Sequence, residues 1–432
     1  MSEQGALLRL RSVTKAPCCE KHYIFSLDSM KSIYIINALF IFFFVGLELI
    51  YCFIRKKDYH KFSDSVTSLS SYFSADIFNI LMQIPVIFVF KLLAGKYAIF
   101  HFEIKSVLNW IICFTAVDFV YYWWHRLSHK VNILWAFHVI HHQSEEYNLA
   151  VAVRKGWFTK LTLAFFYVPL VLIGFPLEML LTGFAFLALY QFILHVRFIG
   201  KLGLLELFLC TFSHHRVHHG REPKYLNKNY GGILIIWDKF FGTFQVEEEE
   251  PLYGMPERYD SSSLWYANIH YWAEMYKLIK GVNYLKDKLK VLFMPPGWVP
   301  EGFGLKHKEL FLNIDGENKF GFKIYIFIHF LLGVFGCVIV AESYKSLTLG
   351  NLLFFSFITL FTLINVCSLN EKKTWVIKSE VIRYFLIIFY LIFYTFGSFN
   401  ILSVISIAIT LFFIGYILIL GNQFKITRQT IT

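Results

Sequence analysis

Long apolar runs, separated by short polar segments, dominate the chain. A helix needs about 20 mostly apolar residues to cross a bilayer. The clearest runs near this length are Tyr34–Ile54, Phe322–Ala341, Leu352–Cys367 and two further runs between Val381 and Leu420. Three others are interrupted by polar groups but are also long enough to enter a membrane: Ile77–Leu93, Leu108–Trp124 and Leu161–Leu194. The pattern predicts an all-α, polytopic integral membrane protein.

The same pattern divides the chain into three zones. Residues 1–124 are predicted to form an N-terminal arm and the first membrane segments, and residues 321–432 a C-terminal transmembrane bundle. Residues 125–320 hold most of the polar surface and every candidate for chemistry. Hydrophobic residues make up 56% of the chain and charged residues only 16%, which excludes an ordinary soluble protein.

The basic residues predict which side of the membrane each zone faces. The first apolar run begins near Ser32 and is too long for a signal-peptide core, so we expect a retained anchor. The loop Asn370–Glu380 and the tail Phe424–Gln429 are basic and should be cytoplasmic. Two spans separate this loop from the central zone, which therefore faces the cytoplasm too. If Ile77–Leu93 crosses fully, the N-terminus is lumenal; if that run is re-entrant, the N-terminus is cytoplasmic.

Charge and cysteine content narrow the function. The net charge of +11 favours anionic lipid headgroups over nucleic acid as the partner, because no basic, aromatic RNA-binding motif accompanies it. The seven cysteines are scattered without a CxxC pair, which argues against a disulfide framework and a structural zinc site.

Two polar segments of the central zone lie outside any apolar run. Residues 261–300 mix Trp and Tyr with Lys, which predicts an interfacial helix that could also serve as a lid. The acidic run Glu247–Glu250 predicts a solvated loop.

Histidines gather in the central zone. Five of the 16 in the chain lie between positions 125 and 142. Three boxes stand out: an HxxxH at His125 and His129, an HxxHH at His138, His141 and His142, and a second HxxHH at His215, His218 and His219. Residues three and four apart share one face of an α-helix, so each box should point its imidazoles the same way.

The number of imidazoles predicts two metal ions. A catalytic zinc takes three protein ligands, whereas the boxes offer eight, and His195 at the end of an apolar run adds a ninth. Imidazole suits iron, copper, nickel and zinc. Iron is favoured because the useful chemistry at a membrane surface is oxidation of lipid C–H bonds. Asp118, two helical turns before His125, could accept the second N–H of a ligand histidine. We expect the isolated histidines to be satisfied core or interfacial residues: His22, His60, His101, His270, His307 and His329.

The order and spacing of the boxes resemble the fatty acid hydroxylase and sterol desaturase superfamily of membrane di-iron enzymes. Several stretches are similar to the members that cleave glyceryl ethers: "DFVYYWWHRLSH", "WAFHVIHHQSEEYNLAVAVR", "SHHRVHHGREPKYLNKNYGGILIIWDKFFGTF" and "MPPGW". The similarity covers most of residues 100–320. It implies an O2-dependent monooxygenase of the endoplasmic reticulum membrane that converts alkylglycerols into a fatty aldehyde and a glycerol derivative, with tetrahydrobiopterin as reductant.

The resemblance also implies the site residues. The two iron ions would be held by His125, His129, His138, His141, His142, His195, His215, His218 and His219, with catalytic contributions from Asp118, Asn229 and Asp238. Two positions depart from the family pattern: Lys130 stands where an acidic residue is common, and Gln191 lies one turn before His195 where further histidines are found.

Two alternatives remain open from the sequence. One is another membrane di-iron lipid hydroxylase or desaturase, acting on sterols or fatty acyl chains and supplied with electrons by cytochrome b5. The other is a metal-binding transporter, which is disfavoured because transporters place ionisable residues near the middle of their spans. The sequence does not determine the oligomeric state.

Overall fold

The structure is a computed structural model that describes residues 31–257, 259, 261–300, 320–371, 374–394 and 401–429. These residues form an all-helical fold, as predicted, and within them the only β-type pairings are two isolated bridges. The basic N-terminal arm with Arg9 and Lys15, together with His22 and His307, lies outside the described residues.

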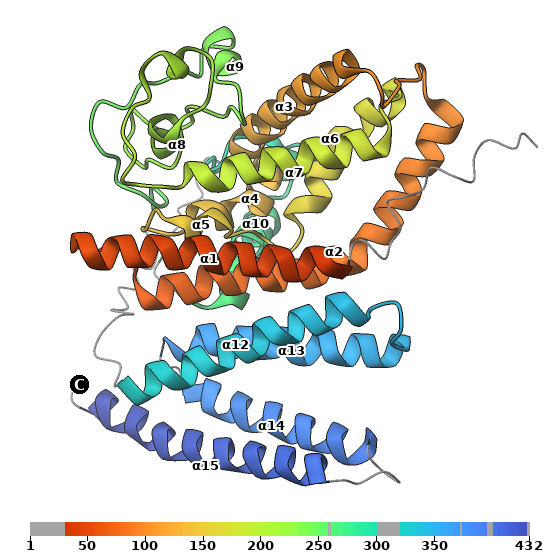
Figure 1. Cartoon of the computed structure of the whole chain (residues 1–432). Coiled ribbons are helices and arrows are strands. Elements are labelled where there is room, and N and C mark those ends of the chain that lie inside the picture. The colour runs from red at the N-terminus through yellow and green to blue at the C-terminus, as the bar shows by residue number, and fades with distance from the viewer. Residues whose placement is uncertain are drawn as a thin grey trace, which may run out of the picture.

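Long apolar helices build the N-terminal half. They are α1 (Lys31–Arg55), α2 (Phe62–Tyr97), α3 (Val107–Lys130), α6 (Thr159–Ile173) and α7 (Leu177–Leu194). The run Ile77–Leu93 is part of the 36-residue α2, which contains Pro85 and bends along its length (Figure 1). The run Leu161–Leu194 is not one span, because Gly174 ends α6 at φ 110° before Pro176. A Cβ at Gly174 would lie 1.8 Å from the Phe100 carbonyl oxygen, so only glycine fits there.

Short helices fill the central zone. They are α4 (Asn132–His138), the 3-10 helix η1 (Val139–His142), α5 (Leu149–Ala152), the 3-10 helix η2 (Gly203–Leu207), α8 (Phe212–His218) and α9 (Ile236–Phe240). The segment predicted as an interfacial helix forms two helices, α10 (Leu264–Gly281) and α11 (Leu285–Phe293). Helix α10 packs against α2 and α13, and α11 packs against α4.

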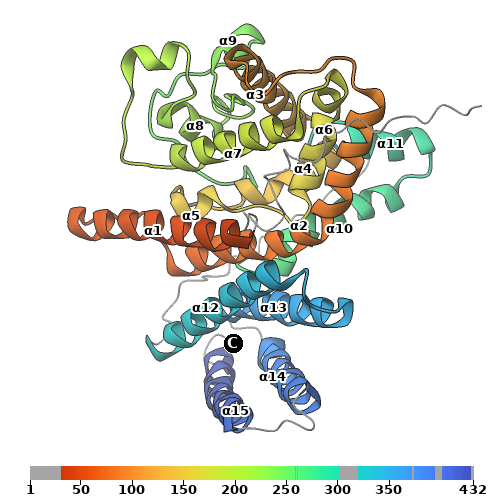
Figure 2. The same cartoon turned by 45° about the vertical axis from the view of Figure 1, so that its right-hand side comes forward.

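Four helices make up the C-terminal bundle: α12 (Phe320–Ser343), α13 (Leu349–Leu369), α14 (Thr374–Tyr394) and α15 (Ile401–Gln429). They lie on the side of α1 and α2 opposite to α7, α8 and α9 (Figures 1 and 2). Helix α12 packs against both α1 and α2, so the bundle is attached to the N-terminal half through these two helices.

The C-terminal bundle contains buried charged residues as well as apolar ones. Glu380 and Arg383, both on α14, form a buried pair with two contacts of 2.8 Å. The Tyr325 hydroxyl donates to Glu380, and the Tyr384 hydroxyl lies 2.5 Å from His329 Nε2. His329 is thus a satisfied core histidine, as predicted, inside a polar cluster that joins α12 to α14.

Six described helices are long and apolar enough to cross a membrane: Tyr34–Arg55, Phe62–Tyr97, Val107–Lys130, Leu177–Leu194, Phe320–Ser343 and Leu349–Leu369. Many of their large apolar side chains face outward, for example Phe53 on α1 and Phe88 on α2. Such a surface fits lipid rather than water, so the protein is a multi-pass membrane protein. The predicted boundary between residues 124 and 125 falls inside α3, and the three-zone division stays a prediction.

Candidate metal centre

The histidine boxes lie at the ends of helices that meet at one place. The first box occupies the last turns of α3, and His195 follows the last residue of α7. The third box lies on α8, with His219 as its C-terminal cap. The second box differs from the expected α-helix, because α4 ends at His138 and residues 139–142 form a 3-10 turn. This tighter turn still directs all three of its imidazoles into the same space.

All nine predicted histidines come together, in two groups. Within each group the potential ligand atoms lie within 4.8 Å of one another. The five-histidine group consists of His125, His129, His138, His142 and His218, and the four-histidine group consists of His141, His195, His215 and His219. The groups adjoin, because the rings of His142 and His219 stack with centroids 4.5 Å apart. Both groups draw on the second and third boxes, so the boxes form one centre rather than separate sites.

Several of these histidines have one ring nitrogen held by a backbone carbonyl. The Nδ1 atom lies 2.8–3.1 Å from a carbonyl oxygen in four cases: His125 with Tyr230, His141 with Arg154, His195 with Gln191 and His218 with Lys228. A carbonyl only accepts hydrogen bonds, so each Nδ1 must donate. The proton on Nδ1 leaves Nε2 of the neutral ring with a free lone pair, the form that a metal needs.

The opposite ring nitrogens are buried without a hydrogen-bond partner. This holds for Nε2 of His125, His129, His195, His215, His218 and His219. Buried nitrogen atoms that lack a partner are costly unless something binds them. Six such atoms converging in one centre fit metal ions well.

Burial also keeps the imidazoles outside the membrane spans uncharged. It lowers the pKa of His141 to about 4 and the pKa of His218 to about 3. For His142 and His219, burial followed by repulsion from neighbouring imidazoles lowers the pKa well below the usual value. At neutral pH these rings are therefore uncharged imidazoles, each with one ring nitrogen free to bind a metal.

Two predicted catalytic residues, Asp118 and Asp238, organise a loop behind the five-histidine group instead of touching a histidine. Asp118 does not accept the N–H of a ligand histidine, and that expectation is wrong. Its carboxylate accepts hydrogen bonds from the Ile233 and Leu234 backbone N–H groups at 2.6 and 3.1 Å. Asp238 accepts from the Tyr230 and Gly231 N–H groups at 2.8 and 2.7 Å. Both carboxylates thus hold the loop whose Tyr230 carbonyl orients His125.

Asn229, the third predicted catalytic residue, shapes the start of that loop. It adopts a left-handed backbone conformation with φ 54°, which asparagine tolerates better than most residues. Its side chain donates to the His214 carbonyl and accepts from the Gln245 backbone N–H. The neighbouring Lys228 carbonyl accepts from His218, so Asn229 also acts on the centre through the backbone.

The two positions that depart from the family pattern have different surroundings. Gln191 lies on α7, and its side-chain amide donates to the Gly232 carbonyl at 2.5 Å while its backbone carbonyl accepts from His195. It therefore links the loop after Asn229 to the four-histidine group. Lys130 is exposed at the end of α3 and belongs to neither group.

Outside the centre, His214 and His270 have local roles. His214 takes part in the N-terminal cap of α8 with Thr211. His270 on α10 is hydrogen-bonded to the Tyr266 carbonyl at 3.0 Å. Neither belongs to a histidine group of the described residues, as expected for His270.

Sequence reasoning missed the aromatic side chains that enclose the centre. The Tyr147 ring stacks on His195 with centroids 5.2 Å apart, and the Trp135 ring stacks on His142 at 5.6 Å. Both residues lie within stretches that resemble the family, but nothing in their spacing indicated these contacts.

An apolar cavity of about 320 Å³ lies between the second box and α10. Its walls include Phe137 and Ile140 from the box segment, Trp157, and Trp272 from α10. The predicted interfacial helix therefore covers the outer side of the segment that carries His138 and His141.

Comparisons with known proteins agree with this picture. Residues 110–243 match the family model described as fatty acid hydroxylase, and no solved structure matches the chain. An alkylglycerol monooxygenase from Danio rerio is 31% identical over 80% of this chain and 80% of its own. The Xenopus tropicalis alkylglycerol monooxygenase is 33% identical over 82% of this chain and 80% of its own. The Homo sapiens protein of the same description is 37% identical, covering 60% of this chain and 59% of its own.

Proposed function

This chain belongs to the alkylglycerol monooxygenase family, and we propose that it cleaves the O-alkyl bond of glyceryl ethers in an O2-dependent reaction. The products would be a fatty aldehyde and a glycerol derivative. The observation that carries this proposal is the cluster of nine histidines, seven of them buried, where the spans α3 and α7 meet the short helices α4 and α8. The relatives of this chain bear the activity in their names.

The donor set fits two iron ions, one in each histidine group. The unpartnered Nε2 atoms supply the ligands, and the carbonyl-bound Nδ1 atoms fix their direction. When bound, iron together with tetrahydrobiopterin would supply O2 activation and the two electrons that a monooxygenase reaction consumes. The chain's own part is to hold nine imidazoles at fixed positions and to keep bulk water away with Tyr147 and Trp135.

Asp118, Asn229 and Asp238 contribute as positioning residues. Each fixes part of the loop whose Lys228 and Tyr230 carbonyls orient two histidines of the five-histidine group. Asp118 and Asp238 are buried, so their hydrogen bonds to backbone N–H groups have little competition from water.

We place the protein in the endoplasmic reticulum membrane with the centre on the cytoplasmic face. The family resemblance supports the compartment, and the basic loop Asn370–Glu380 and basic C-terminal tail support the orientation. A lipid substrate would reach the centre from the bilayer, because α3 and α7 both run from apolar spans directly into it.

The test is turnover of an alkylglycerol by membranes that contain the protein. Fatty aldehyde should be released with O2 and tetrahydrobiopterin, and release should stop when either is omitted. Aldehyde release supported by NADH and cytochrome b5, without tetrahydrobiopterin, would keep the ether cleavage and contradict tetrahydrobiopterin as the reductant. No release under either condition would contradict the proposal.

A further inference from the structure

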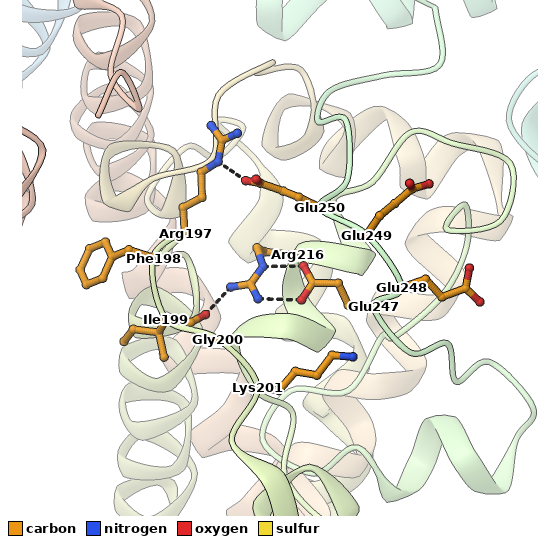
Figure 3. Close-up of a pocket in the computed structure, with 10 residues that line it drawn as sticks. All are labelled: Arg197, Phe198, Ile199, Gly200, Lys201, Arg216, Glu247, Glu248, Glu249 and Glu250. Atoms are coloured by element: carbon orange, nitrogen blue, oxygen red, sulfur yellow. Dashed lines mark hydrogen bonds and ion pairs between the residues drawn. The ribbon is translucent and has the colours of Figure 1, made fainter. Parts of the chain in front are cut away.

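The acidic run Glu247–Glu250, predicted to be a solvated loop, is only partly solvated. Glu248, Glu249 and Glu250 are exposed, but Glu247 is buried with 8% of its surface accessible. Its carboxylate forms a two-pronged pair with the Arg216 guanidinium, with contacts of 2.6 and 2.7 Å (Figure 3). The prediction of a solvated loop is therefore wrong for Glu247, because this side chain is buried. Removing Arg216 would leave a buried carboxylate without its charge partner, which is costly.

Arg216 lies inside the third histidine box, directly after His215. Its third guanidinium nitrogen donates to the Ile199 carbonyl at 2.7 Å and lies 3.5 Å from the Val196 carbonyl. Val196 directly follows His195. Arg216 therefore lies next to His215 in the sequence, and its guanidinium contacts the residue after His195. These two ligands of the four-histidine group come from different helices, α8 and α7.

The surrounding polar groups keep this arrangement in place. Arg216, Glu247 and Ile199 line a cavity of about 270 Å³ together with Arg197, which pairs with Glu250 (Figure 3). Lys224 pairs with Glu249 at the outer end of the run, where the Glu249 side chain is 70% exposed. Of the three ion pairs described for Glu247, Glu249 and Glu250, only Arg216–Glu247 is buried. The pair fixes the guanidinium, which joins α8 to the segment after α7 through the Ile199 carbonyl.

We infer that Arg216 and Glu247 are positioning residues for the metal held by the four-histidine group. The planar fork of arginine fixes direction as well as distance, which a flexible ammonium group does not. The five-histidine group depends instead on the loop fixed by Asp118 and Asp238. Each half of the centre thus has a main support of its own, with Gln191 as a link between them, and the inference rests on the proposed two-metal centre.

The experiment uses the purified full chain loaded with iron and measures metal content and the rate of metal release to a chelator. The wild type should hold two metals per chain. Glu247→Gln keeps the shape of the side chain but removes its charge, and Arg216→Lys keeps the charge but removes the fork. In both variants one of the two metals should leave roughly 10-fold faster or more, while the other leaves at the wild-type rate.

Glu249→Gln is the matched control, since it changes a neighbouring but exposed member of the same acidic run and should behave as the wild type. Two metals released at wild-type rates from both variants would overturn the inference. Equal acceleration of both metals, or loss of the folded state in both variants, would show a general structural role and also overturn it. A wild type without metal would instead contradict the proposed function.

Discussion

At the scale of single residues, each ligand histidine needs a direction as well as a position. Backbone carbonyls provide that direction for four of the nine, and the remaining rings pack against one another at centroid distances near 5 Å. Carbonyl partners cannot be removed by changing a side chain. The ligand rings themselves, and the carboxylates that shape the loop, are therefore the residues to test.

Replacing one histidine from each box should abolish turnover. His129→Ala, His142→Ala and His219→Ala lie up to 90 positions apart, yet each removes an imidazole from the same centre. His270→Ala is the control and should be nearly silent, because that ring is bonded only to its own helix within the described structure. The measurement is aldehyde release by variants whose expression and folding match the wild type. A folded box variant with two metals and near-normal turnover would remove that box from the centre.

Asp238→Asn should weaken metal binding by roughly 10- to 100-fold, as is usual when a partner of a ligand histidine is disturbed. The carboxylate accepts from two backbone N–H groups and from the Thr243 hydroxyl, and the asparagine amide offers one acceptor oxygen instead of two. Iron titration of the metal-free protein measures the effect. Asp287→Asn on α11 is the control at a partly exposed carboxylate outside the histidine groups, and equal affinities for the two variants would contradict a positioning role for Asp238.

At the scale of helices and loops, the polar cluster of the C-terminal bundle decides how α12, α13 and α14 pack. The Asn365 amide on α13 donates to Glu380 at 2.8 Å, and Tyr325 on α12 donates to the same carboxylate. Arg383 supplies the balancing charge from one turn further along α14. Three helices thus converge on one buried carboxylate.

Removing the charge of that carboxylate should destabilise the bundle without emptying the metal centre. Glu380→Gln leaves Arg383 buried without its charge partner, which typically costs about 3–5 kcal/mol. Thermal unfolding in detergent, followed alongside iron content, measures both effects. Asp287→Asn breaks a partly exposed surface pair with Lys290 and should cost less than about 1 kcal/mol. Loss of iron in Glu380→Gln protein that is still folded would show that the bundle supports the centre directly.

The elements that could be predicted from the sequence are those with a repeating pattern. Apolar runs located the spans, and the three- and four-residue spacing of histidines located the boxes. The loop from Asn229 to Asp238 has no such period, and its hydrogen bonds to Asp118 join residues more than 100 positions apart. The burial of Glu247 depends on Arg216 in the same way. Such contacts arise from chain folding and leave no local signal.

At the scale of the whole molecule, an apolar outer surface and a polar, histidine-lined interior meet at the ends of α3 and α7. The large exposed apolar side chains on the spans suit lipid contact, and the histidines lie where those spans end. This arrangement suits a substrate that stays in the membrane while its polar end is oxidised.

The most direct test of this account is the iron content of the purified full chain. Nine clustered imidazoles in two groups predict two iron ions per chain, both lost when His129 and His219 are replaced together. A stoichiometry near two, with aldehyde release from an alkylglycerol rising in proportion to iron content, is the expected result. A stoichiometry near one, or near zero with turnover intact, would contradict the two-metal centre.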